Sequence, residues 1–400
     1  MHHKSAVFIT IAFMTFLLLP QFGILLNIQG EGENLQNRTL SQFPAISIKA
    51  VSSASFGEKI NEYVWDHLPL RSQFIKVDHW IDYYIFHDSP IPEQLMLGKD
   101  GWFFLYDTVI TWPKKNAQYA NQLVTLAREA TQIQKKTGIE IVIVPSPSKA
   151  SIYPEFLTDY YQKEFTRHAS IYQNELEAAA TSDATSLLLL WDPFRKEKAR
   201  LLQDNQACIE IEKSLCYLFR PRNRHFDWDT AIFQARIIIE RIAPGKWQNN
   251  LYSMYLDPQL KYRQSEMEVR FIRVDLPEAY VNFQSRKFLD VYSIQQEVFP
   301  IKGTNMKFDV FKTDPQSPIQ PVQKRVVVIH DSFMNQSKFL ITPYFQESIF
   351  MHWAVSHGNI SLFTETIGKA EILILEGVEG FWYNRLKILN EILEELAQVG

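Results

Sequence analysis

The hydrophobic positions of the chain form two patterns, a helical spacing and short continuous apolar runs. Between residues 55 and 90, apolar side chains recur every three or four positions, which predicts helical structure. Pro69 interrupts this stretch and divides it into two helices. Helical spacing returns further along the chain, over residues 116–137, 164–182 and 229–243 and again from Phe381 onward.

Short apolar runs between these helices predict buried strands. The clearest are Ile139–Val144, Arg325–Ile329 and Ala370–Leu375, and Ser186–Trp191 is a fourth. Helix, buried strand and loop in alternation predict an α/β domain with a central parallel sheet. Two further features are a Gly-Lys-Asp-Gly turn at residues 98–101, which indicates a hairpin, and residues 246–322, interpreted as an insertion.

The segment from residue 5 to residue 28 carries no charge and is long enough to cross a bilayer, which needs about 20 residues. Lys4 precedes it and Glu31 follows it, so the positive-inside rule predicts a cytoplasmic N-terminus and an exported body. A cleaved signal peptide is the alternative, although the expected small-residue cleavage site is missing. We therefore predict three parts, namely an anchor (1–28), an extended lead-in with helices (29–95) and a main domain (96–400).

Composition excludes several classes of function. The net charge is −4 and no basic run occurs, which argues against nucleic acid as a partner. Cys208 and Cys216 lack the neighbouring His and Cys residues that a zinc site needs. They could form a disulfide or remain two unpaired thiols, and the sequence does not decide between the two. Walker, GxGxxG, HExxH and CxxC motifs are absent from the sequence, so no cofactor and no metal are expected.

Candidate chemistry begins at the sequence VVVIHDSF. Ser332 follows a predicted buried strand and precedes a predicted helix, which is where a nucleophile is exposed and where helical N–H groups can bind an oxyanion. The alternative is that Asp331 or Ser332 caps the next helix. A serine nucleophile needs a general base.

His225 is the histidine best placed to be that base. It lies in a polar loop before a predicted helix, close to the carboxylate of Asp227, and the two could complete a triad with the serine. The alternative is a surface histidine at a helix start. Lys149 follows the first buried strand, where it could bind an anionic sugar or pair with a carboxylate, and a solvated lysine is the alternative. Glu379 follows the last predicted strand, and a solvated side chain is likewise the alternative to a role in the site.

An ordered set of short motifs gives the chain a resemblance to a known family. The motifs are Asn37-Arg38-Thr39-Leu40, Asp66-His67-Leu68-Pro69-Leu70-Arg71, Gly98-Lys99-Asp100-Gly101-Trp102-Phe103-Phe104, Val144-Pro145 with Lys149, Tyr153-Pro154-Glu155, Trp228, Asp331-Ser332-Phe333 and Glu376-Gly377-Val378-Glu379. In this order they resemble the alginate O-acetyltransferase family of SGNH-hydrolase-like proteins, the AlgJ, AlgX and DHHW group. The resemblance spans about residues 33 to 385 and is weakest over 246–322.

The resemblance implies a three-layer SGNH-hydrolase-like domain in the periplasm, held at the inner membrane. It also implies acetyl transfer to or from a secreted polysaccharide through a Ser–His–Asp triad. The acetyl groups would come from a membrane-bound O-acyltransferase partner.

This sequence departs from the family at critical positions. His330 stands where the family usually has Gly before Asp-Ser-Phe. The family carries Asp-x-His-Trp upstream of the serine. If Trp228 sets the register, His225 occupies the Asp position and Asp227 the His position. If His225 sets the register, Asn223 occupies the Asp position and the tryptophan match is lost.

Each register has a chemical consequence. In the first, a carboxylate with a reference pKa near ~3.9 would face Ser332 and is a poor base for a hydroxyl. In the second, an amide would orient the imidazole, and a comparable Asp-to-Asn change costs a serine protease about 10⁴ in rate. The leading hypothesis is therefore O-acetyl transfer by Ser332, His225 and Asp227, supported by Asp331, His330, Asn223 and Lys149. The alternatives are a degenerate scaffold or glycan-binding subunit and an acetyl esterase.

Overall fold

The computed structural model describes the chain in fourteen stretches, which are residues 7, 10–11, 13–15, 41–47, 51–53, 55–68, 71–89, 91–204, 217–221, 228–248, 289–290, 292–300, 307–354 and 365–399. The chain divides into two compact units, Met1–Pro92 and Glu93–Gly400, and each is described by itself. Cys208, Cys216, Asn223, His225 and Asp227 lie outside the described residues. The predictions made for them stay predictions.

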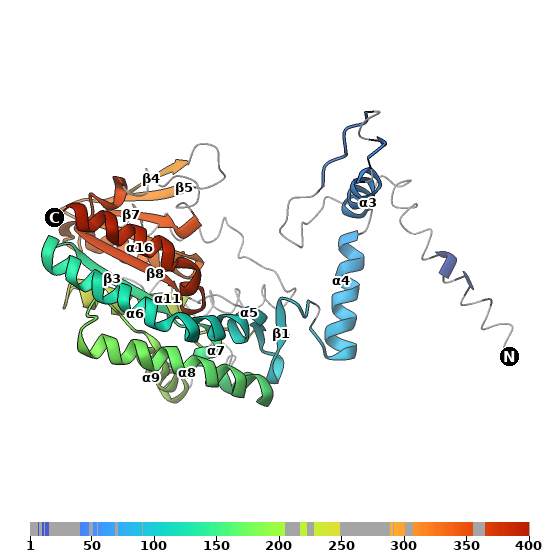
Figure 1. Cartoon of the computed structure of the whole chain (residues 1–400), viewed down its shortest axis with the longest axis horizontal. Coiled ribbons are helices and arrows are strands. Elements are labelled where there is room, and N and C mark those ends of the chain that lie inside the picture. Colours follow the sequence, from blue (N-terminus) through green and yellow to red (C-terminus); the bar gives the residue numbers. More distant parts are fainter. Residues whose placement is uncertain are drawn as a thin grey trace. The chain divides into compact units, whose positions relative to one another are not determined.

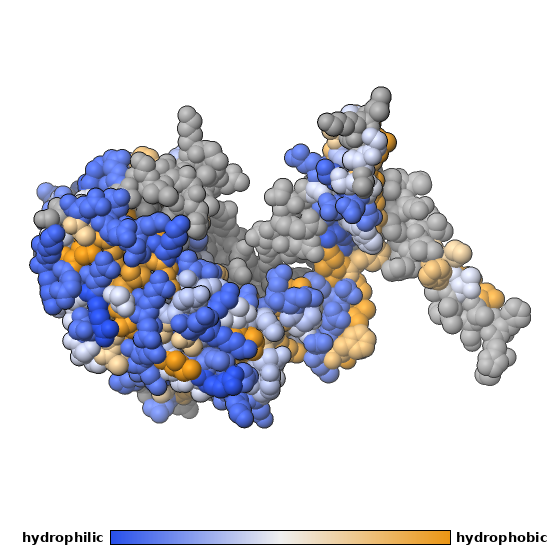
Figure 2. Space-filling view, viewed as in Figure 1, coloured by the Kyte–Doolittle hydropathy of each residue, from blue (hydrophilic) through white to orange (hydrophobic). Residues whose placement is uncertain are grey.

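The first unit contains the two helices predicted around Pro69. These are α3 (Phe56–Asp66) and α4 (Arg71–Ile81), and α4 continues into a π-helical turn, η1 (Asp82–Phe86). Figure 2 shows hydrophobic residues on the surface of this unit. Its exposed hydrophobic side chains include Val77, Ile85 and Phe86. Among the described residues, which include only six of the predicted anchor, no helix has the length and apolar character needed to cross a membrane. The anchor stays a prediction.

The second unit opens with the predicted hairpin. Strand β1 (Leu95–Leu97) pairs antiparallel with β2 (Phe103–Leu105) across the turn η2 (Lys99–Gly101). Asp100 and Gly101 both adopt positive φ, at 54° and 73°, as a tight turn of this kind requires. Gly98 is required for space, because a Cβ there would lie 2.3 Å from the carbonyl oxygen of Phe156.

A six-stranded mixed sheet forms the centre of the second unit (Figure 1). Its order is β3-β8-β6-β7-β5-β4. The first four strands are parallel to one another, β5 pairs antiparallel with β7, and β4 pairs antiparallel with β5. The strands are β3 (Glu140–Ser146), β4 (Ile294–Pro300), β5 (Lys307–Thr313), β6 (Val322–His330), β7 (Phe345–His352) and β8 (Ile372–Val378). The fold is therefore α/β, but the sheet is mixed where a parallel sheet was predicted.

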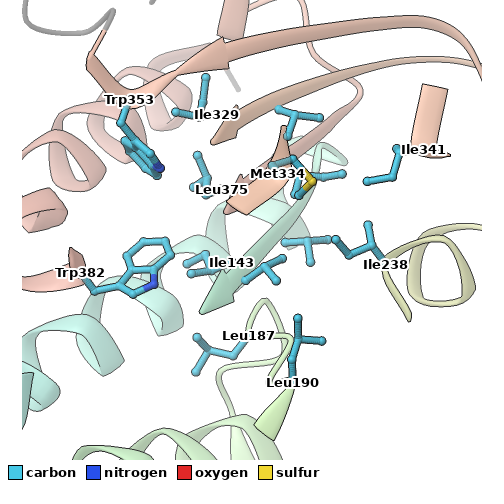
Figure 3. Packing of buried hydrophobic residues seen from close by; sticks show 14 of the residues in the cluster. Ile143, Leu187, Leu190, Ile238, Ile329, Met334, Ile341, Trp353, Leu375 and Trp382 are labelled. Atoms are coloured by element: carbon cyan, nitrogen blue, oxygen red, sulfur yellow. The ribbon is translucent and has the colours of Figure 1, made fainter. Parts of the chain in front are cut away.

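Helices cover both faces of this sheet. Helices α6 (Thr111–Thr137) and α16 (Trp382–Val399) pack beside each other on one face. Helices α11 (Trp228–Ile242) and α14 (Ser337–Ile341) pack together on the other. Figure 3 shows this layering, with Trp353 and Trp382 on one side of the strands and Met334, Ile238 and Ile341 on the other. The helices predicted over 116–137 and 229–243 are thus confirmed.

Three features differ from the sequence prediction. Ser186–Trp191 does not form a strand, because only Leu187 bridges to Ile143 and Trp191 already begins helix α9 (Trp191–Asp204). Strand β7 was not predicted. The segment interpreted as an insertion, 246–322, contributes β4 and β5, which extend the sheet at its antiparallel edge.

Candidate active site

The Ser332 turn lies at the carboxyl end of β6. Ser332 is partly buried and begins the 3-10 turn η6 (Ser332–Met334), two residues after the strand's last residue. Asp331 caps this turn, because its Oδ1 accepts the N–H of Phe333 at 2.9 Å. Since β6 lies between the parallel strands β8 and β7, the turn is at the sheet edge where α/β proteins usually place their sites.

Asp331 holds the turn in place as a buried ion. Its Oδ2 accepts the N–H of Val378 at 2.8 Å and pairs with Arg385 of α16 at 2.9 Å. Burial by itself would raise the pKa of Asp331, but the charge of Arg385 and the N–H groups of Val378 and Phe333 outweigh it and lower the pKa. Asp331 is therefore an ionised anchor of the Ser332 turn, and its role in catalysis stays a prediction.

Gly377 makes room for this ion pair. The guanidinium of Arg385 lies within 5.1–5.8 Å of the ring centres of Trp353, Phe381 and Trp382. A Cβ on Gly377 would lie 1.4 Å from Nη1 of Arg385. The glycine of the Glu-Gly-Val-Glu motif is therefore needed because the arginine side chain crosses directly over its Cα.

A second buried carboxyl, Glu376, links the strand ends to the helices of the other face. Its Oε1 accepts the hydroxyl of Ser146 at 2.6 Å, and its Oε2 accepts the N–H of Asp331 at 3.3 Å. Gln234 of α11 donates to Ser146 at 2.7 Å and accepts from Ser337 of α14 at 2.6 Å. Burial, reinforced by the charge of Asp331, raises the pKa of Glu376 well above its usual value.

This network fixes the position of α11 against the Ser332 turn. The helix begins one residue after Asp227 in the chain, so it continues directly from the segment that carries the predicted base. Near its start, the hydroxyl of Thr230 donates to the carbonyl of Leu218, whose N–H donates to the hydroxyl of Tyr153 at 2.9 Å. The residues that follow residue 227 are therefore tied to the same part of the fold as the serine.

Lys149 fixes the residue that precedes this segment. The side chain is buried, and its Nζ donates to the carbonyls of Phe103 at 2.8 Å and Pro221 at 2.5 Å. The N–H of Phe103 also donates to Pro221, at 2.8 Å, and the ammonium lies 4.7 Å from the ring centre of Trp102. The interpretation of Lys149 as a solvated lysine was wrong, because the side chain is buried and bonds to main-chain carbonyls, whereas its predicted supporting role at the site stays a prediction. It holds the backbone at the entrance to residues 222–227.

Glu379 is likewise a buried structural carboxylate and not a solvated one. It accepts the N–H of Ser148 at 2.9 Å, the hydroxyl of Tyr172 at 2.7 Å and the indole N–H of Trp191 at 2.5 Å. The hydroxyl of Ser151 donates to it as well. These donors come from the loop after β3 and from α7 (Lys149–Ile152), α8 (Asp159–Ser182) and α9.

His330, the residue in place of the family's glycine, is buried and 4% exposed. Its Nδ1 lies 2.7 Å from the carbonyl oxygen of Asp331 and must donate to it. Burial lowers the pKa of His330 to about 4, so the ring is neutral at neutral pH. The imidazole packs edge-on against Phe350 and braces the backbone of the turn, which makes His330 a structural support and not a base.

A second histidine, His352, lies beside it and was missed from the sequence. It ends β7, directly in register with His330 on β6, and the two ring centres are 6.1 Å apart. Arg385 and Glu376 were also missed as members of the site. The only sequence signal for His352 was its place at the end of an unrecognised strand. Within the described residues no group of three or more His, Cys, Asp or Glu side chains could hold a metal ion, and the expectation of metal-free chemistry stays a prediction.

Comparison with known proteins relates part of this unit to acetyltransferases. Residues 95–199 match the family described as SGNH hydrolase-like domain, acetyltransferase AlgX. A curated relative, the probable alginate O-acetylase AlgJ of Pseudomonas aeruginosa, is 28% identical over 110 residues, which is 28% of this chain and 27% of the relative. The chain thus matches about a quarter of that relative's length.

Several solved structures also show similarity to this chain, at low sequence identity. The O-acetyltransferase domain of Pseudomonas putida AlgJ is 16% identical with a TM-score of 0.40, covering 74% of this chain and 99% of that one. Bacillus cereus PatB1 with a sulfonyl adduct is 11% identical with a TM-score of 0.42, covering 71% and 93%. Pseudomonas aeruginosa AlgX is 12% identical with a TM-score of 0.37, covering 80% and 69%.

Proposed function

We propose that this chain transfers acetyl groups onto a secreted polysaccharide with Ser332 as the nucleophile. The match of residues 95–199 to the SGNH hydrolase-like acetyltransferase family and the similarity to a probable alginate O-acetylase support this proposal. The observation that carries the proposal is the position of Ser332. It stands at the carboxyl end of a central parallel strand, in a turn held by a buried ion pair. The name of the curated relative makes alginate the first polysaccharide to try.

The proposed reaction has two steps. Ser332 Oγ attacks the carbonyl carbon of a donor acetyl ester while His225 takes the hydroxyl proton, and the donor oxygen leaves with that proton. A sugar hydroxyl then attacks the acetyl-serine, gives its proton to His225, and Ser332 Oγ regains a proton as it leaves. Asp227, or Asn223 in the other register, would orient the imidazole.

The fixed flanks of residues 222–227 support this assignment. Lys149 holds Pro221 on one side and Thr230 holds Leu218 from the other, so the segment that carries His225 starts and ends at anchored backbone. The Gln234–Ser146–Glu376 network ties the following helix to the strand next to the serine. Such support is what a base needs in order to stay within reach of its nucleophile.

The setting of the reaction is also part of the proposal. Residues 5–28 would anchor the protein in the inner membrane with its body in the periplasm, where a membrane-bound O-acyltransferase would supply the acetyl groups. Tagging the chain at its C-terminus and testing protease access in spheroplasts checks this orientation. Protection of the tag in intact spheroplasts and its digestion after lysis would contradict a periplasmic body.

A degenerate glycan-binding subunit is the second candidate, and the exchange of His225 and Asp227 relative to the family motif favours it. The test is product analysis with the full-length chain in detergent, an activated acetyl ester and unacetylated polymannuronate. Ser332-dependent acetylation of the glycan supports the transferase, and Ser332-dependent release of acetate alone indicates the esterase. Glycan binding without either product supports the subunit.

A further inference from the structure

His352 is the last residue of β7, and it lies beside the strand that leads into Ser332. In a parallel pair, residues in register point to the same face, so His352 and His330 share one face of the sheet. Adjacent strands are ~4.8 Å apart and each residue advances ~3.3 Å, which places the Cα of Ser332 roughly 8 Å from that of His352. An imidazole and an acetyl group on the serine together can bridge that distance.

The hydrogen bonding of His352 fixes its tautomer. The backbone N–H of Ala354 donates to Nδ1 at 3.1 Å, so Nδ1 is an acceptor and the proton of the neutral ring is on Nε2. His352 is more accessible to solvent than His330, although its ring is partly covered. His352 therefore presents an N–H donor near the turn and not a lone pair.

The surroundings keep this ring neutral. Partial burial lowers the pKa of His352; the charge of Asp331 raises it and that of Arg385 lowers it, and the net direction is downward. Among the described residues, the other titratable or charged groups near this edge include the neutral His330, Glu376 with its raised pKa, and the ammonium of Lys338, which is paired with Asp309 at 2.6 Å. A neutral N–H donor can stabilise the negative charge that develops on the acetyl oxygen without taking the proton of the serine hydroxyl.

We propose that His352 is a catalytic hydrogen-bond donor whose Nε2–H binds the carbonyl oxygen of the acetyl group attacked by, and carried on, Ser332. This assignment rests on the proposed acetyl transfer. His352 is not the general base, because its Nδ1 is occupied and its Nε2 carries the proton in the neutral ring. It stabilises the oxyanion, while proton transfer is left to His225.

The test measures how fast Ser332 becomes acetylated in the full-length chain, using p-nitrophenyl acetate and peptide mass spectrometry. Removing one oxyanion donor typically costs about 10² to 10³ in rate, and we expect a loss of that size in His352→Phe. His352→Gln, which restores an N–H donor, should recover most of the loss. His168→Phe, on the surface of α8, is the matched control and should react like the wild type.

The outcomes separate this inference from the proposed function. Equal acetylation rates in the wild type and His352→Phe, with labelling still lost in Ser332→Ala, overturn the role of His352 and leave the nucleophile intact. If the wild type shows no Ser332-dependent label, the proposed function fails instead. The role of His352 then fails with it. An Nδ1-protonated His352 in ¹⁵N-histidine NMR would overturn that role whether or not the label forms.

Discussion

Removing Arg385 should destabilise the protein far more than removing an exposed arginine. The side chains of Arg385 and Asp331 are both 8% exposed and 2.9 Å apart. In Arg385→Met the aromatic surroundings keep an apolar side chain, but Asp331 is left as an uncompensated buried charge. Breaking a buried pair in this way costs about 3–5 kcal/mol, a large part of a total stability of about 5–15 kcal/mol.

The control is Arg128→Met, which removes a surface ion pair with Asp183 at the same 2.8–2.9 Å spacing. Its side chains are 48% and 57% exposed, so the expected loss is within about 1 kcal/mol. Urea unfolding of both variants at pH 7, followed by tryptophan fluorescence, measures the difference. A loss in Arg385→Met no larger than that in Arg128→Met would refute the view that Asp331 is an ionised anchor.

The same pair predicts a dependence on pH. The folded pKa of Asp331 is lowered, so its contribution to stability is present above the unfolded value near ~3.9 and is lost as pH falls through the folded pKa. Removing Arg385 removes the largest of the contributions that lower this pKa, so the pKa of Asp331 should be higher in Arg385→Met than in the wild type. The deficit of Arg385→Met relative to the wild type should therefore be largest at neutral pH and shrink on acidification.

Three further substitutions test other parts of the site. Gly377→Ala should lower stability by an amount close to that of Arg385→Met, because the new Cβ displaces the guanidinium, and urea unfolding measures it. The folded pKa of Glu376 is raised, so its contribution to stability is lost as pH rises above its unfolded pKa near ~4.3. In Glu376→Gln the free energy of unfolding should therefore fall less steeply with rising pH than in the wild type. An unchanged pH profile would show that the carboxyl is ionised. Lys149→Met should cost about 1.5–3 kcal/mol for the lost charged hydrogen bonds, whereas Lys99→Met, at a 43% exposed side chain, should cost within about 1 kcal/mol.

The period of the hydrophobic pattern was enough to predict most of the fold. The buried runs around residues 141, 327 and 373 form adjacent parallel strands, because continuous apolar runs are stable only where both faces are covered. Strand β7 was missed because its first half, with Gln346, Glu347 and Ser348, does not have this pattern. Ser186–Trp191 has the composition of a strand, but it forms only one bridge before Trp191 starts a helix.

The site was predicted only in part, for a different physical reason. Ser332 and Asp331 were found because they follow a recognisable strand. The role of Lys149 depends on carbonyls 46 and 72 residues away, which no local pattern encodes. His352 depends on the register of two strands, and Arg385 on its pairing with Asp331, 54 residues away in the chain. Long-range partners of this kind decide whether a polar side chain is solvated, structural or reactive.

The most direct test of the central claim is the mass of the peptide that contains Ser332 after the full-length chain has been mixed with an activated acetyl ester and quenched. The account predicts one added acetyl group on Ser332 in the wild type and in Ser170→Ala, a control at an exposed serine of α8, and none on this peptide in Ser332→Ala. The label should form much more slowly in His225→Ala. An unlabelled Ser332 in folded wild-type protein, or labelling that is equally fast without His225, would contradict the claim that this chain is a serine-dependent acetyltransferase.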